Sequence, residues 1–135
     1  MKSRLSLLVI SALLISGCAQ GDSKKSTTPK LTAAEANNQK MIRNCEIRMP
    51  HLIDFSAYYQ SGDFLMALDA ITYRAGSLSV LSYSEEEGTL LNATNRSERI
   101  VAGQLNNGVN KSKEINQFLK DIDLYIDFCN SLTIQ

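Results

Sequence analysis

The sequence has few of the residues on which catalysis and metal binding depend. Its 135 residues include a single histidine, His51, two prolines and three cysteines. There is no CxxC or HExxH motif, no glycine-rich phosphate loop and no EF-hand spacing. A Ser-His-Asp or Cys-His arrangement would have to use His51, which follows Pro50 at the start of a predicted helix. We therefore expect no enzymatic activity, no metal, no other cofactor and no small-molecule substrate.

The N-terminus has the pattern of an export signal. Lys2 and Arg4 precede a short apolar run over residues 5–15, which is too short to span a membrane as a helix. The run ends in Ile15-Ser16-Gly17-Cys18, which resembles the lipobox of bacterial lipoproteins. The alternative is an ordinary signal peptide in which Cys18 is incidental.

The lipobox resemblance implies both an anchor and a location. In bacterial lipoproteins the Cys is acylated, the signal is removed and the lipidated Cys becomes the first residue. An Asp directly after it retains the protein at the inner membrane, but Ala19 and Gln20 stand here. The resemblance therefore implies a protein anchored in the outer membrane by lipid on Cys18 and facing the periplasm.

The remaining chain has the size of one small domain behind a tether. We interpret residues 1–17 as the signal peptide and residues 18–31 as the lipidated Cys and a disordered tether, because this segment is polar and lacks apolar periodicity. Residues 32–135 form the predicted helical domain. Two of the 14 basic residues lie in the signal, so 12 remain against 14 acidic residues, and neither charge forms a long run. We expect no nucleic-acid partner, because such binding needs a basic surface.

Two cysteines remain for the folded domain. Cys45 and Cys129 form an even pair in an exported chain, for which a disulfide is the expected state. Each lies in the middle of an apolar stripe on a predicted helix, so both should point inward. The alternative is two buried free thiols.

Helix caps and apolar periodicity predict the architecture. Thr32-Ala33-Ala34-Glu35 is a capping box that starts a first helix, and Pro50 should close or kink it. A short second helix over 51–59 stops near Gly62, and Asp63 can cap a third, which Gly76 ends or interrupts. We predict that residues 77–83 continue the helix or form a loop.

Two further helices complete the prediction. A second capping box is formed by Ser84-Glu85-Glu86-Glu87. We interpret its carboxylates as part of a helix cap rather than as a metal or catalytic cluster. This helix frays near Gly108, and the last helix starts near Ser112. One arc of the last helix is apolar: Ile115, Phe118, Leu119, Ile122, Tyr125, Ile126, Cys129 and Leu132. We predict an all-α fold, a small antiparallel bundle of four to five helices clamped by one disulfide.

The third helix offers the candidate for partner binding. Its core stripe is Phe64, Leu68, Ile71 and Ala75. Met66 and Tyr73 point to the opposite side, and Leu65 lies between the two faces. Such a helix is either fully enclosed or has one side left for a partner. We hypothesise that Leu65, Met66 and Tyr73 line a groove that receives an apolar helix or tail of another protein.

In its lipobox, length, helical pattern and cysteine pair the chain resembles the pilotins. These lipoproteins bind the C-terminal tail of a secretin subunit and bring it to the outer membrane. The wide separation of Cys45 and Cys129 departs from the closer spacing of type II secretion pilotins. The resemblance implies a binding factor for a secretin or another secretion or pilus complex of the envelope. The alternative is a self-protection lipoprotein, which excludes incoming plasmids or neutralises a toxin.

Overall fold

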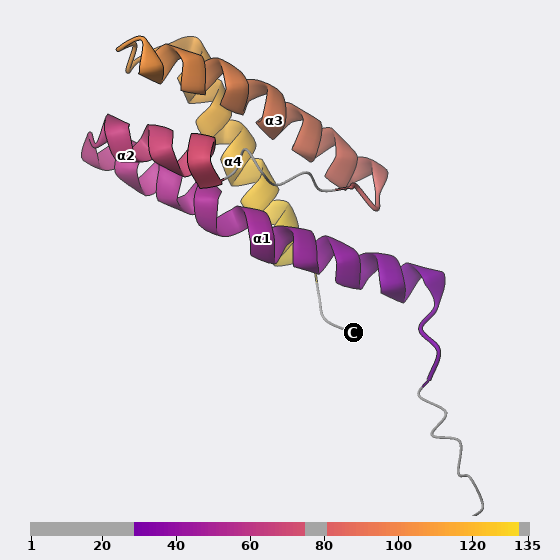
Figure 1. Ribbon diagram of the computed structural model, residues 1–135. Helices are drawn as coiled ribbons and strands as arrows, with labels where there is room; N and C mark the ends of the chain where they lie inside the picture. Colours follow the sequence, from indigo (N-terminus) through magenta and orange to yellow (C-terminus); the bar gives the residue numbers. More distant parts are fainter. Residues whose placement is uncertain (1–28, 75–80, 133–135) are drawn as a thin grey trace, which may run out of the picture. The chain divides into compact units, whose positions relative to one another are not determined.

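The structure of the protein is a computed structural model that describes residues 29–74 and 81–132 (Figure 1). The chain divides into Met1–Lys30 and a compact unit that starts at Leu31. The described residues are helical and contain no strand: α1 (Ala33–Ser61), α2 (Phe64–Asp69), the π-helical segment η1 (Ala70–Arg74), α3 (Glu85–Asn106) and α4 (Lys113–Ser131). The predicted all-α bundle is confirmed.

Helix α1 begins where the sequence predicts. The Oγ1 of Thr32 accepts a hydrogen bond from the Glu35 backbone N–H at 3.2 Å, and the Glu35 carboxylate accepts one from the Thr32 N–H at 2.6 Å. These two bonds satisfy free backbone donors at the helix start, and they make the predicted capping box.

Pro50 does not end α1, so the prediction of a separate helix over 51–59 is wrong. The helix continues for 29 residues to Ser61, and Gly62 ends it at φ 81°. A proline inside a helix costs about 3 kcal/mol through a lost hydrogen bond and a steric clash. Here Cys45 before Pro50 and Leu52 and Phe55 after it are all buried in the same core. Burying these side chains requires a continuous helical face, and their packing outweighs the cost of the proline.

The core-facing stripe of the next element agrees with the prediction in part: Ile71 is buried, and Phe64 and Leu68 pack against the core. Asp63 caps α2 by accepting a hydrogen bond from the Met66 N–H, as expected. The fully buried side chains are Ala67, Ala70 and Ile71, whereas Phe64 and Leu68 are only half-buried. Helix α2 and η1 both pack against α1, and α2 runs beside α1 in Figure 1. Small buried residues such as Ala67 of α2 and Ala70 of η1 permit a close approach between helices. The predicted stripe residue Ala75, Gly76 and residues 77–80 lie outside the described residues.

Helices α3 and α4 form the most extensive helix pair. Ser84 and Ser112 cap them, each accepting a hydrogen bond at 3.1 Å from the backbone N–H three residues on. On α4 the predicted inner residues are buried or half-buried, and the predicted outer ones are exposed: Asn116, Lys120, Asp123, Asp127 and Asn130. Ser97 of α3 donates to the buried carboxylate of Asp121 on α4 at 2.6 Å, which adds a polar contact to this interface.

A disulfide joins the first and last helices. Cys45 of α1 and Cys129 of α4 are bonded, and their Cα atoms lie 5.7 Å apart. Both cysteines are buried in the core. The same core contains a contact between the rings of Phe55 on α1 and Phe118 on α4, whose centroids are 4.9 Å apart. The predicted clamp across the bundle is confirmed.

Candidate functional site

A surface groove of about 740 Å³ lies between the α2–η1 segment and α3. Residues of α2 and η1 form one wall, and the last turns of α3 form the other. The lining residues are Leu65, Met66, Leu68, Asp69, Thr72, Ala102, Gly103 and Asn106. The groove is open to solvent, and apolar side chains and small residues dominate its walls.

Two of the three residues predicted to bind a partner line this groove. Leu65 is 77% exposed, and Met66 is half-buried. Both lie away from the side of α2 on which Ala67 is fully buried against the core. The backbone of Tyr73 belongs to η1, but its side chain lies outside the described ones. The structure therefore places Leu65 and Met66 together at one groove.

The α3 residues that line the groove were not predicted from the sequence. Gly103 lies inside α3, and apart from its chain neighbours and the backbone of its own helix, no atom lies within 4 Å of the position that a Cβ would take there. A glycine inside a helix costs about 1 kcal/mol relative to alanine. Packing within the described residues does not require a glycine at this position. An isolated glycine in a helical pattern, next to Ala102, is the sequence signal that could have indicated a close approach at α3.

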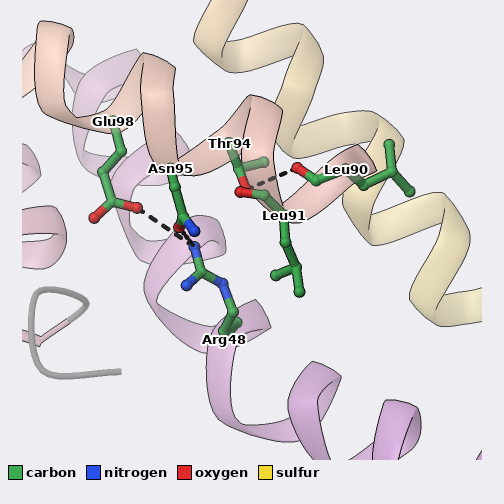
Figure 2. A network of polar contacts seen from close by, with 6 residues as sticks. All are labelled: Arg48, Leu90, Leu91, Thr94, Asn95 and Glu98. Carbon is green, nitrogen blue, oxygen red and sulfur yellow. Dashed lines mark hydrogen bonds and ion pairs between the residues drawn. The ribbon is translucent and has the colours of Figure 1, made fainter. Parts of the chain in front are cut away.

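A polar cluster around a buried arginine joins α1 to α3 (Figure 2). Arg48 of α1 is only 3% exposed. Its Nη2 donates to the Oδ1 of Asn95 at 2.8 Å and lies 3.5 Å from the Oε2 of Glu98. Figure 2 shows both α3 side chains directed toward the guanidinium of Arg48. On the same helix, the Thr94 hydroxyl bonds to the carbonyls of Leu90 and Leu91.

Burial changes the acid–base properties of this cluster. Burial raises the pKa of Glu98, while the positive charges of Arg48 and Arg99 oppose the rise. Burial likewise raises the pKa of Tyr125 to about 12; Arg48 opposes this shift, and Glu87 adds to it. The Tyr125 hydroxyl and the Arg48 Nε have no hydrogen-bond partner among the described residues. The buried guanidinium of Arg48 on α1 contacts the α3 side chains of Asn95 and Glu98, so we assign this cluster to linking α1 with α3.

Glu87 has a structural role that differs from the predicted capping box. Its backbone N–H does bond to Ser84, but its carboxylate accepts hydrogen bonds from the Tyr83 N–H at 2.5 Å and from Asn44 of α1 at 2.7 Å. Asn44 also donates to the carbonyl of Leu81 at 2.9 Å. The carboxylate is fully buried because it ties α1 to the start of α3.

The side chains weighed for catalysis or metal binding are spread over the bundle. His51 is half-buried within α1, and Asp123 and Asp127 are exposed on α4. Among residues 29–74 and 81–132, no three His, Cys, Asp or Glu side chains are grouped so that they could hold a metal ion. In the same ranges no helix combines the length and apolarity that a membrane crossing requires.

A smaller hollow of about 510 Å³ lies on α3, and all its described lining residues belong to that helix. It is lined by Asn92, Asn95, Arg96, Arg99 and Ile100. Two arginine and two asparagine side chains make this hollow cationic and polar, whereas the groove nearer the end of the same helix is mainly apolar.

Comparisons with protein-family models, with curated proteins and with solved structures find no match for this chain.

Proposed function

We propose that the protein is an outer-membrane lipoprotein that acts as a binding factor, comparable in role to a pilotin, for a secretin or another envelope secretion or pilus complex. Two features support the proposal. The Ile15-Ser16-Gly17-Cys18 run, followed by Ala19, supports lipid anchoring at the outer membrane. The groove between α2 and α3 supports capture of a protein segment.

The groove is the observation that favours the first of the two candidate functions. Leu65, Met66 and Leu68 give one wall apolar side chains, and Leu65 is exposed more than any other large hydrophobic side chain of the described residues. Apolar surface of this kind at a groove is typical of a site that receives an apolar helix. A toxin-immunity protein would instead need a charged or polar face. The proposed occupant is therefore the apolar C-terminal tail of an envelope complex subunit.

The groove can be tested with one defined probe. A labelled peptide from the C-terminal tail of a secretin encoded in the same genome should bind the full-length protein in nanodiscs, followed by fluorescence anisotropy. Leu65→Ser combined with Met66→Ser should weaken binding at least tenfold and leave the thermal midpoint nearly unchanged. Leu124→Ser is the matched control, because Leu124 is 55% exposed on α4, away from the groove. Unchanged binding in the double variant, or a collapse of its stability, would place the partner site elsewhere.

The anchor is tested separately. A Cys18→Ser variant should lose its association with outer membranes in a flotation gradient, because no acyl chain could be attached. If the variant lost its signal peptide and still floated with outer membranes, the lipobox interpretation would be wrong.

A further inference from the structure

The apolar groove and the cationic hollow lie along the same face of α3. Asn92, Arg96, Arg99, Gly103 and Asn106 follow one another at intervals of three or four residues. At 100° per residue they occupy one strip of the helix surface, about 80° wide. With a rise of 1.5 Å per residue the strip is about 21 Å long. We call these five residues the α3 strip.

The two ends of the α3 strip differ in chemistry. At the Gly103 end, the strip adjoins the apolar wall of α2, and the one charged side chain that lines the groove is Asp69. At the other end, the charged side chains that line the hollow are Arg96 and Arg99. Among the described residues Arg96 has no ion-pair partner, and Arg99 acts on Glu98 only through its charge. An acidic group therefore fits over the arginines and not beside Asp69.

We propose that the α3 strip binds a single helix of the partner protein, with small and apolar residues at one end and a pair of acidic residues at the other. The apolar half rests on the proposed function; the acidic half extends it. A strip about 21 Å long matches about four helical turns. Helices pack 8–10 Å apart, and the open space over Gly103 permits such an approach. Arg96 and Arg99 are three residues apart, so their guanidinium groups can meet two carboxylates one turn apart on the partner.

The charges argue against two other occupants. In a symmetric dimer through this face, Arg99 would lie near the middle of the strip and face its own copy, which is repulsive. The chain's own segment 19–31 contains Lys24, Lys25 and Lys30 but only one acidic residue, so its charge does not complement the arginines. An acidic helix of a different protein is the occupant that the charges favour.

The test uses two synthetic helical peptides of 16 residues. Both present leucine and alanine on one face in the first two turns. In the last two turns the same face has two glutamates one turn apart in the first peptide and two lysines in the second. Binding to the full-length protein, held in nanodiscs of zwitterionic lipid, is measured by fluorescence anisotropy. The glutamate peptide should bind about tenfold more tightly or better, and the difference should shrink as salt is raised.

Variants locate the effect. Arg96→Glu with Arg99→Glu should reverse the preference between the peptides, whereas Lys113→Glu with Lys120→Glu, exposed on α4, should leave it unchanged. Gly103→Leu should weaken both peptides without loss of helicity, because its side chain enters open space.

The failures are distinguishable. If both peptides bound equally, the apolar groove and the proposed function would stand, and the acidic half of the inference would be wrong. If neither bound, the groove itself would be refuted. The inference would also be overturned if the Arg96→Glu/Arg99→Glu variant still preferred the glutamate peptide. The same holds if Arg96 and Arg99 bound the surface of nanodiscs made of anionic lipid instead of the peptide.

Discussion

Removing the disulfide should cost this domain a large part of its stability. Bonding Cys45 to Cys129 closes a loop with a sequence separation of 84 residues. In the chain-entropy model a crosslink of this span lowers the entropy of the unfolded chain by an amount worth about 4.6 kcal/mol at 25 °C. Small domains have unfolding free energies of about 5–15 kcal/mol. Without the bond, the protein should therefore be marginally stable.

The experiment compares the oxidised protein with a Cys45→Ala/Cys129→Ala variant. Alanine is preferred to serine because both positions are buried, and a hydroxyl there would add an unsatisfied polar group. Urea unfolding followed by circular dichroism at 222 nm gives the midpoint of the transition and the slope of the unfolding free energy against urea concentration. The variant should lose about 4 kcal/mol or more, and its slope should rise because its unfolded chain exposes more surface.

The reasoning has a clear point of failure. Reduction of the native protein should reproduce the effect of the double substitution, since both release the same loop. A loss below about 1.5 kcal/mol in both would show that the unfolded chain is already compact near these cysteines, and the loop-entropy argument would not hold for this chain.

Three further substitutions test the buried cluster and the groove. The pKa of Glu98 is raised in the folded state, so the contribution of this carboxyl group to stability is greatest at low pH and falls as the pH rises through that pKa. In urea titrations from pH 4 to 7, the native protein should therefore lose stability relative to a Glu98→Gln variant. A relative gain in stability would show that the pKa of Glu98 is not raised. Tyr125→Phe should change the unfolding free energy by no more than about 1 kcal/mol, or increase it, because the hydroxyl has no partner; a loss above about 2 kcal/mol would reveal a hydrogen bond. Gly103→Ala should stabilise the protein by about 1 kcal/mol in thermal unfolding, and destabilisation would mean that the glycine serves the fold.

Features set by neighbouring residues could be predicted from the sequence. The caps at Thr32, Asp63, Ser84 and Ser112 all lie where their side chains indicate, because a cap bonds to a backbone N–H only two or three residues away. The two faces of α4 were likewise evident from its regular apolar spacing.

Features that depend on distant packing could not be predicted. The rule that proline ends helices fails at Pro50, because the core on both sides of it holds the helix together. Asn44, Arg48 and Glu87 break the apolar pattern of their helices, and only the fold shows that each is buried opposite a polar partner. At the candidate site, the amphipathic pattern of one helix indicated Leu65 and Met66, but the second wall is contributed by α3, more than 30 residues later in the chain.

The disulfide also determines how the protein responds to a pulling force. Tension applied between the two chain ends would enter along α1, cross from Cys45 to Cys129 through the covalent bond, and leave through the last residues of the chain. Everything between the two cysteines forms a closed ring that this tension does not stretch, and both walls of the groove belong to that ring. The groove would thus keep its shape under a load that frays the first turns of α1, and reduction of one bond would remove this protection.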